Sequence, residues 1–297
     1  MKASSFLSPP IEALPRNGLL QTHSEQVDIL RLDQLHPVVS GNKWFKLKYN
    51  IEMALANGYQ SLLSCGGVHS NHLHALAKAG QYYQLQTHAL VRGYSEVALT
   101  STLKDCQNMG MNLEFVNKKT YLQRYDPHWC QQQAQRLSSY WIPEGGNNEL
   151  GIQGCGEIAN ACLNAEKNYD QVWLSIGSGC TFKGVERVLP KSIKLRGILA
   201  IKGGQSLAQE LLASALYPHR CEFDFDSHYG GFGRCPDELQ ALIHRYDESN
   251  LPLDPVYTAK LVAAFEQSWQ QGLLPLNQNY LLIHTGGLQG RRGIDGL

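Results

Sequence analysis

The chain has 297 residues, of which 43% are hydrophobic, so it can bury the core of one large domain or of two smaller ones. Lysine and arginine together number 26, and so do aspartate and glutamate. This balance excludes a global field that would attract nucleic acid or an anionic membrane surface, so any recognition has to be local.

Cysteine usage and the apolar segments point to a reducing compartment. The eight cysteines are scattered and form no Cys-x-x-Cys pair, which argues against a zinc site or a disulfide framework. We expect no metal and reduced, mostly buried thiols. The N-terminal stretch MKASSFLSPPIEALPRNG lacks the apolar run of a signal peptide, and no stretch reaches the ~18 apolar residues of a membrane-spanning helix. We therefore expect a cytoplasmic protein that binds neither membrane nor nucleic acid.

Short apolar runs alternate with segments of helical period, which predicts βαβ units and a parallel sheet. The clearest unit is a strand at 61–65, a Gly-Gly turn, and a helix that follows Ser70 and ends at Gly80. The same pattern recurs as a strand at 87–93 before a helix within 98–110, a strand at 112–116, and a strand that opens the segment 171–184. The predicted fold class is α/β.

Two glycine-bearing loops follow predicted strands, CGGVHSNH at 65–72 and IGSGCTFKG at 176–184. Ligands of open α/β sheets bind beyond the carboxyl ends of strands, where both loops lie. The second loop leads into a helix, an arrangement that binds phosphate through backbone N–H groups. It matches neither a Walker A loop nor G-x-G-x-x-G, so on its own it is equally well interpreted as a tight turn without a ligand.

The segment SGNKWFKLKYN, residues 40–50, places Lys43 directly behind a Ser-Gly-Asn turn, with Lys46 and Lys48 after it. A lysine beside a turn and a distant phosphate loop are what pyridoxal phosphate requires, because the amine bonds the aldehyde and the loop holds the phosphate. The neighbouring cations would favour the unprotonated amine. Without further context, a single lysine is more simply a solvated side chain.

Six motifs supply that context: SGNKWFKLKYN, CGGVHSNH, PEGGNNELG, GSGCTFKG, LDPVYTAK and IHTGG. In order and approximate spacing they resemble the 1-aminocyclopropane-1-carboxylate deaminase and D-cysteine desulfhydrase family, from about residue 10 to the C-terminus. The resemblance implies a pyridoxal phosphate enzyme of the tryptophan synthase β-like fold (fold type II), with two open twisted, mainly parallel sheets flanked by helices, and a homodimer.

The resemblance further implies a discontinuous large domain, 1–45 with 152–297, a small domain, 46–151, and an active site in the cleft between them. A cluster of proline, glycine and asparagine at 142–151 independently predicts a boundary there. Closing such a cleft over the substrate would exclude water from the reaction.

Individual roles follow from the same resemblance. Lys43 would carry the cofactor and remove the α-proton, with Lys46 the less favoured alternative. Ser70 and Tyr257 would be the other catalytic residues. The cofactor-binding residues would be Lys43, Asn71, Gly177, Ser178, Gly179, Cys180, Thr181, Thr258 and Thr285. The substrate-binding residues would be Ser70, Asn71, His72, Tyr229 and Tyr257, with Tyr229 ranked below Tyr257.

Departures from the family pattern bear on the substrate. The deaminases carry Tyr-Glu where this chain has Tyr257 and Thr258, and a threonine hydroxyl holds a proton on the pyridine nitrogen less well than a carboxylate. A weaker electron sink favours β-elimination with a good leaving group over the opening of a cyclopropane. Thr285 also matches desulfhydrase-like members. His69 and His72 flank the Ser70-Asn71 pair, and each is as readily a packed structural histidine as a proton carrier.

We therefore expect a lyase that acts on a small amino acid, most simply D-cysteine, and forms pyruvate, ammonia and sulfide. Three alternatives stay open: deamination of 1-aminocyclopropane-1-carboxylate to α-ketobutyrate and ammonia, dehydration or racemisation of a D-serine-like amino acid, and a pyridoxal phosphate-binding protein without turnover. The products distinguish the enzymes from one another, and an activity screen distinguishes them from the last alternative.

Overall fold

The computed structural model describes residues 9–15, 26–35, 39–94 and 98–297, and the packing of the chain divides it into two compact units. Unit 1 comprises 1–36, 40–42 and 155–297, and unit 2 comprises 37–39 and 43–154. These units are defined by packing alone. The large domain, 1–45 with 152–297, and the small domain, 46–151, expected from the sequence stay a prediction.

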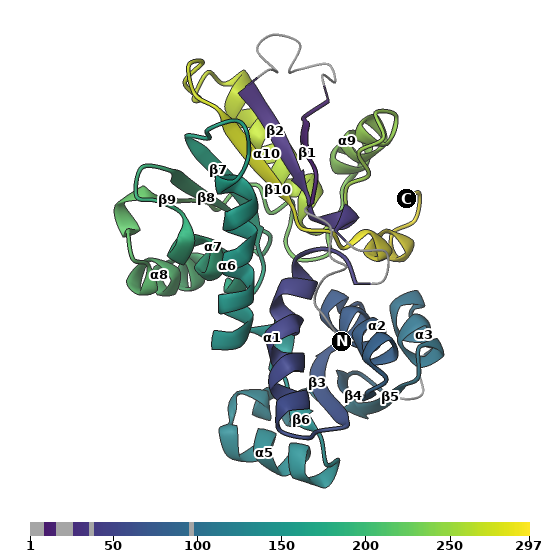
Figure 1. The fold of residues 1–297 in the computed structure, drawn as a ribbon. Helices are drawn as coiled ribbons and strands as arrows, with labels where there is room; N and C mark the ends of the chain where they lie inside the picture. The colour runs from purple at the N-terminus through teal and green to yellow at the C-terminus, as the bar shows by residue number, and fades with distance from the viewer. Residues whose placement is uncertain (1–8, 16–25, 36–38, 95–97) are drawn as a thin grey trace. The chain divides into compact units, whose positions relative to one another are not determined.

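Unit 1 is built on a sheet whose six described strands have the order β1–β2–β10–β7–β8–β9 (Figure 1). The strands are β1 (Ile11–Ala13), β2 (Val27–Arg31), β7 (Gln171–Ile176), β8 (Lys194–Leu199), β9 (Cys221–Asp224) and β10 (Tyr280–His284). Strand β1 runs antiparallel to β2, and the other described pairs are parallel. Every residue of β7 is buried, as expected for a parallel strand covered on both faces.

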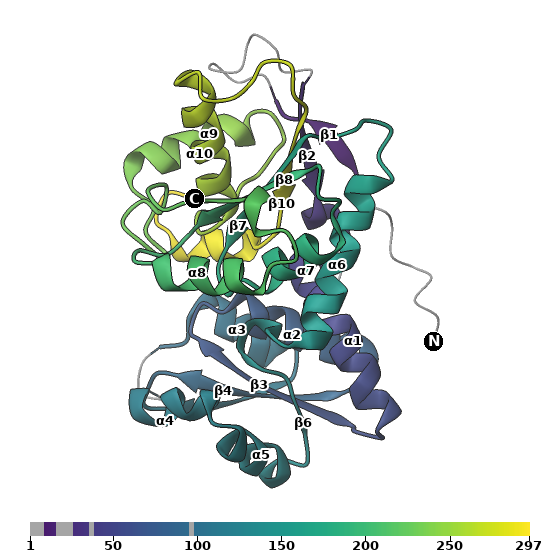
Figure 2. The same cartoon turned by 90° about the vertical axis from the view of Figure 1, so that its left-hand side faces the viewer.

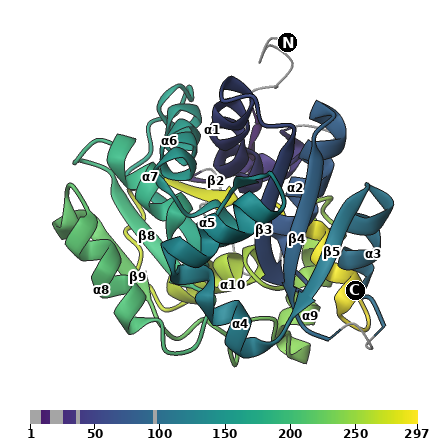
Figure 3. The same cartoon turned by 90° about the horizontal axis from the view of Figure 1, so that it is seen from below.

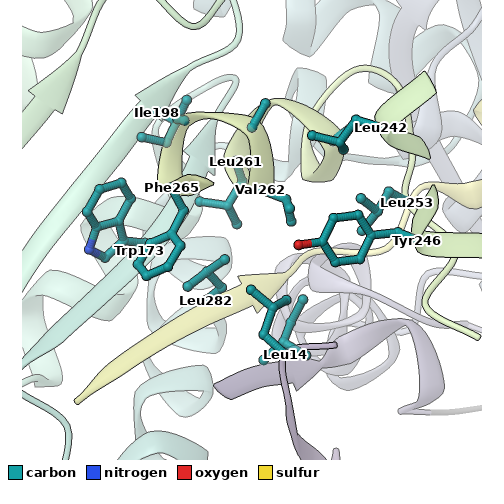
Figure 4. Close-up of a cluster of buried hydrophobic side chains, with 14 of the residues drawn as sticks. Leu14, Trp173, Ile198, Leu242, Tyr246, Leu253, Leu261, Val262, Phe265 and Leu282 are labelled. Atoms are coloured by element: carbon teal, nitrogen blue, oxygen red, sulfur yellow. The ribbon is translucent and has the colours of Figure 1, made fainter. Parts of the chain in front are cut away.

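Helices cover both faces of this sheet. The helices and 3-10 turns of unit 1 are η2 (Leu32–Gln34), α7 (Cys180–Val188), α8 (Gln205–Ser214), η5 (Pro218–Arg220), α9 (Asp237–Asp247), α10 (Thr258–Gln270) and η6 (Leu288–Gly293). On the α10 face, Trp173 packs edge-to-face on Phe265, with ring centroids 5.1 Å apart, beside Leu282 (Figure 4). A Cβ at Gly197 would lie 2.2 Å from Ile176 Cδ1 on β7 and 3.1 Å from the Phe182 ring on α7, so the glycine leaves room for both side chains.

Unit 2 contains a sheet whose four described strands are all parallel, in the order β5–β4–β3–β6 (Figure 2). The strands are β3 (Ser61–Gly67), β4 (Gln86–Arg92), β5 (Met111–Val116) and β6 (Tyr140–Trp141). Its other elements are α2 (Asn71–Tyr83), α3 (Ser101–Asn108), α4 (Lys118–Leu122), η3 (Gln123–Tyr125), α5 (Pro127–Arg136) and η4 (Glu144–Gly146). Helices α2 and α3 lie on one face of the sheet, and α4 and α5 lie on the other (Figures 2 and 3). Two further helices, α1 (Asn42–Ala56) and α6 (Glu149–Leu163), contribute residues to both units.

The predicted α/β class with two mainly parallel sheets flanked by helices is confirmed. The strands expected at 61–65, 87–93 and 112–116 are β3, β4 and β5, although β3 continues through Gly66 and Gly67, where a Gly-Gly turn was predicted. The predicted end of the next helix was also wrong: α2 does not end at Gly80 but continues to Tyr83, and the following residue, Gln84, takes the left-handed cap conformation with φ 57°. Gly80 is required for packing instead, because a Cβ there would lie 2.3 Å from Thr87 Cγ2 on β4.

The cysteines match the sequence prediction. All eight lie in the described part of the chain as thiols, and six of them are buried, while Cys221 and Cys235 are partly exposed. Within the described residues, no helix combines the length and the apolar character needed to cross a membrane.

Candidate active site

The predicted site residues form two groups, one in each unit. Unit 1 holds Gly177, Ser178, Gly179, Cys180, Thr181, Tyr229, Tyr257, Thr258 and Thr285, and unit 2 holds Lys43, Ser70, Asn71 and His72. Within unit 1, the loop of residues 177–180 follows the carboxyl end of β7, and Thr285 follows β10. Within unit 2, Ser70 and Asn71 come after β3. In each unit, part of the group thus lies just beyond the carboxyl end of a parallel strand.

The loop between β7 and α7 has the geometry of an anion cradle. Gly179 is the N-cap of α7 with φ +81°, and a Cβ there would lie 2.8 Å from Leu211 Cδ2, so a larger residue would strain both backbone and packing. The nine-residue helix α7 begins at Cys180, and its N-terminal N–H groups and dipole favour an anion. Ser178 Oγ is buried and has no hydrogen-bond partner among the described residues. An anion held at this loop would supply that partner.

Asn42 connects this loop to the end of β10. Its Nδ2 donates to Thr181 Oγ1 at 3.0 Å, and its backbone N–H donates to the Thr285 carbonyl at 3.1 Å. Gly41, with φ +75°, is needed for this contact because a Cβ there would lie 2.5 Å from the Thr285 oxygen. The residue that immediately precedes Lys43 is therefore fixed by two of the predicted cofactor-binding residues. The sequence alone predicted no role for Asn42, although this residue lies in the SGNKWFKLKYN motif.

Tyr257 lies against the cradle. A Cβ at Gly177 would be 2.8 Å from Tyr257 Oη, so the glycine leaves the space that the phenol occupies. Ser175 Oγ, near the end of β7, donates to the Tyr257 carbonyl at 2.7 Å. The Phe232 ring meets the Tyr257 ring edge-to-face, with centroids 6.0 Å apart. Unit 1 thus brings the predicted catalytic tyrosine and the predicted phosphate loop together, although 77 residues separate Cys180 from Tyr257 in sequence.

Thr258 is fully buried and is bonded within the start of α10. Its hydroxyl donates to Asp254 Oδ2 at 2.7 Å and accepts the Asp254 N–H at 2.6 Å. The same carboxylate accepts the N–H groups of Val256, Tyr257 and Thr258 at 3.0, 2.9 and 2.8 Å, and so fixes the first turn of α10. A hydroxyl that already donates its proton has no second one for an unprotonated ring nitrogen. Of the two threonines, Thr285 is the better candidate for that contact.

Tyr229 is used largely for packing. Its ring lies partly buried against the hydrophobic core under α9 and α10, and its backbone has φ +52°. Burial, with smaller effects from Glu238, Glu266 and Asp224, raises the pKa of its phenol. These surroundings favour Tyr257 over Tyr229 as the tyrosine that meets a substrate.

In unit 2, Ser70 has a structural duty that leaves its proton available. It is the N-cap of α2, and its Oγ accepts the Leu73 N–H at 3.2 Å. A Cβ at Gly66 would lie 2.6 Å from Ser70 Oγ, so the glycine near the end of β3 provides room for this side chain. Asn71 follows as the first residue of α2. The serine hydroxyl can therefore still donate a hydrogen bond to a ligand.

The two histidines of this loop differ. His72 is buried, its Nε2 lies 2.9 Å from Ser64 Oγ, and its Nδ1 has no hydrogen-bond partner among the residues that the structure describes. Burial, reinforced by the charges of Lys43 and Lys46, lowers the pKa of His72 to about 3. The imidazole is therefore neutral near pH 7 and does not carry a proton there. His69 is exposed.

Lys43 is the second residue of α1 and is partly buried. Lys46, one helical turn later, is buried, and a Cβ at Gly146 would lie 2.9 Å from Lys46 Cβ and 3.6 Å from His72 Cε1. Gly146, with φ +65°, thus lets the loop of the PEGGNNELG motif pack directly on Lys46 and His72. Lys46 is thus a packed side chain in the interior of unit 2. Lys43 is therefore the better candidate for the reactive amine.

Among known sequences, no family model matches the chain. It is 26% identical over 298 residues to a proposed 1-aminocyclopropane-1-carboxylate deaminase of Pyrococcus horikoshii, an alignment that covers 95% of this chain and 90% of the relative. A second protein of that name, from Thermotoga maritima, is 26% identical over 313 residues, with 98% and 97% covered. The D-cysteine desulfhydrase of Klebsiella pneumoniae is 25% identical over 303 residues, with 94% and 91% covered.

Solved structures agree with this sequence similarity to 1-aminocyclopropane-1-carboxylate deaminases. The crystal structure of a homologue of 1-aminocyclopropane-1-carboxylate deaminase superimposes with a TM-score of 0.81 at 25% identity, covering 95% of this chain and 90% of that one. Threonine deaminase isoform 2 from Solanum lycopersicum gives a TM-score of 0.67 at 17% identity, with 95% and 80% covered. A pyridoxal 5'-phosphate-dependent aspartate racemase gives 0.68 at 15% identity, with 96% and 92% covered. The last two likenesses show the fold alone.

Proposed function

Because the chain is a relative of the 1-aminocyclopropane-1-carboxylate deaminase and D-cysteine desulfhydrase family, whose members are pyridoxal phosphate-dependent deaminases and lyases, we propose that it is a β-eliminating lyase acting on D-cysteine or a similar β-substituted D-amino acid. The observation that carries the proposal is the loop of residues 177–180. It follows a buried strand, starts a helix, presents an unpartnered buried serine hydroxyl, and has the Tyr257 phenol against it.

The donors of each group suit a different part of pyridoxal phosphate, and we propose that the two groups hold it together. Ser178 Oγ and the N-terminal N–H groups of α7 would hold the phosphate, and Thr285 would face the ring nitrogen. Lys43 would hold the aldehyde carbon through Nζ, and Asn71 would bond the 3′-oxygen. When bound, the cofactor supplies the electron sink that lets the α-proton and then the β-substituent leave.

The side chains of the protein supply geometry and proton transfer. Once the substrate amine has displaced it from the aldehyde carbon, the freed Lys43 Nζ would remove the α-proton as general base. Ser70 Oγ accepts the Leu73 N–H and would orient the substrate by donating a hydrogen bond to its carboxylate. Tyr257 Oη donates a proton to the departing thiolate. For D-cysteine and one water molecule, the products are sulfide, ammonia and pyruvate.

The preference for elimination over ring opening follows from the surroundings of Thr258. The carboxylate at the start of α10, that of Asp254, is bonded to three backbone N–H groups and to the Thr258 hydroxyl, so it holds the helix rather than a proton on a ligand. A threonine hydroxyl as ring partner leaves the pyridine nitrogen largely unprotonated. The reaction then depends on a good leaving group such as thiolate, which a cyclopropane lacks.

The test is a parallel assay of pyruvate and α-ketobutyrate with D-cysteine, L-cysteine and 1-aminocyclopropane-1-carboxylate as substrates. We expect pyruvate and sulfide from D-cysteine at the highest rate, and loss of activity in Lys43→Ala. The His69→Gln variant is the matched control, because His69 is an exposed side chain of the same unit. Faster release of α-ketobutyrate from the cyclopropane substrate would make the protein a deaminase and refute the elimination proposal. Failure to turn over any of the three would favour a cofactor-binding protein without turnover.

A further inference from the structure

Lys260 is a buried lysine that the proposed reaction does not use. It is the third residue of α10, its side chain is fully buried, and its Nζ donates to the Gly231 carbonyl at 2.8 Å and to the Ala200 carbonyl at 3.3 Å. A buried ammonium is unfavourable unless it is hydrogen-bonded, and a cation in the first turn of a helix opposes the helix dipole. Burial lowers the pKa of Lys260 to about 8, while Asp254 and Cys235 act to raise it. Burial of the ammonium and its position in the first turn of α10 are both unfavourable. The two hydrogen bonds of Lys260 therefore point to a function.

The first acceptor lies in a loop that needs to be held. The loop of residues 228–234, between β9 and α9, contains four positive φ angles, +52° at Tyr229, +84° at Gly230, +116° at Gly231 and +74° at Gly233. Its local bonds are few and short-range, such as the Gly231 N–H to the His228 carbonyl at 3.0 Å. Positive φ at a tyrosine is unfavourable and persists only when surrounding contacts enforce it. The ammonium of Lys260 is a long-range contact of that kind.

The second acceptor ties the same ammonium to the edge of the sheet that carries the anion cradle. Ala200 directly follows β8, and its N–H donates to the Ile176 carbonyl at 3.1 Å. Ile176 is the last residue of β7 and immediately precedes Gly177. Lys260 therefore connects the 228–234 loop with the strand ends next to the predicted phosphate loop.

The loop presents one aromatic side chain to the candidate site. Phe232 is 59% exposed, which gives it little role in the core, yet its ring contacts Tyr257 edge-to-face. Tyr257 and Lys260 are three residues apart, so one turn of α10 contacts the loop twice, through the phenol ring and through the ammonium.

We propose that Lys260 is a positioning residue that holds the 228–234 loop through the Gly231 carbonyl, so that Phe232 orients the Tyr257 phenol and covers it on one side. As far as it concerns catalysis, this proposal rests on the proposed function, in which Tyr257 Oη meets the substrate. The tether itself is a property of unit 1 and can be measured without any substrate.

The tether is tested by limited trypsin digestion of the cofactor-loaded protein. Arg234 is exposed and lies in the loop, while Arg136 is exposed at the end of α5 in unit 2 and serves as the internal reference. In Lys260→Met we expect cleavage after Arg234 to become about tenfold faster relative to cleavage after Arg136, the factor that follows from losing one hydrogen bond to a charged group. Lys260→Arg, which keeps the donors, should restore much of the protection. If Lys260→Met does not fold, Lys260→Leu, which likewise has no hydrogen-bond donor, serves in its place. An unchanged cleavage ratio in a folded variant would overturn the tether.

The catalytic part is tested by a double-mutant cycle on D-cysteine turnover. Phe232→Ala and Lys260→Met should each lower kcat/KM by about tenfold with cofactor retention unchanged, and the double variant should be no worse than either alone, since both act through the same loop. Fully additive losses would show that Lys260 does not act through Phe232. If the wild-type protein turns over no substrate, the proposed function fails, while the trypsin result still decides the tether.

Discussion

Replacing His72 with glutamine should make the protein less sensitive to acid. In the folded chain, burial and the charges of Lys43 and Lys46 lower the pKa of His72 to about 3, whereas the unfolded side chain has the ordinary value of about 6.5. The unfolded state therefore binds more protons between these two values. Stability contributed by the neutral imidazole is complete above about pH 6.5 and is lost as the pH falls toward 3.

The size of the effect follows from the difference in proton binding. At pH 5, protonation of the unfolded imidazole lowers the free energy of unfolding by about 2 kcal/mol relative to pH 7.5, and at pH 4 by about 3 kcal/mol. His72→Gln removes this contribution, although loss of the imidazole contact with Ser64 lowers stability equally at every pH. The informative quantity is thus the pH dependence and not the stability at one pH.

Urea denaturation at pH 7.5, 5.0 and 4.0, with equal cofactor loading, measures this dependence. Wild type should lose about 2 kcal/mol more than His72→Gln between pH 7.5 and 5.0. His69→Gln is the matched control, because that side chain is exposed and should leave the wild-type profile unchanged. Equal pH dependence in wild type and His72→Gln would refute the reasoning, since it would mean that the folded imidazole takes up a proton as readily as the unfolded one.

Three further predictions concern the cofactor. Lys43→Ala should abolish the visible absorption band of the purified protein and the adduct that borohydride fixes, and an adduct persisting on another lysine would contradict the assignment. Gly179→Val should weaken cofactor retention at the cradle, measured by equilibrium dialysis, whereas Gly203→Val, with a similar φ of +76° and open space around it, should cost about 1–3 kcal/mol of stability but retain the cofactor. Thr285→Val should shift the visible band and slow elimination, while Thr258→Val should chiefly lower the melting temperature, because its hydroxyl bonds Asp254; the opposite assignment of effects would identify Thr258 as the ring partner.

The elements predicted most accurately from the sequence were those that depend on the local pattern of apolar and turn-forming residues. The buried strands at 61–65 and 87–93 were found because short β-rich apolar runs end at glycines or turns. The end of α2 was missed because a glycine has two uses that sequence does not separate. Gly80 resembles a helix terminator, yet it serves the close packing of α2 on Thr87, a contact set by the neighbouring strand. Likewise, nothing local shows that Gly177 makes room for the phenol of Tyr257.

For the candidate site, sequence motifs identified the kinds of chemical group but not which of them are already engaged. Thr258 appears in its motif as a hydroxyl that could meet a ring nitrogen, and only the fold shows that this hydroxyl already donates its hydrogen bond to Asp254. His72 appears as an ionisable neighbour of Ser70, and only its burial shows that it is neutral. Lys260 appears as an ordinary charged residue of the same motif as Thr258, yet its ammonium reaches a loop 29 residues away in sequence. Hydrogen bonds between distant segments therefore decide which of the motif's polar groups can act on a ligand and which hold the site in shape.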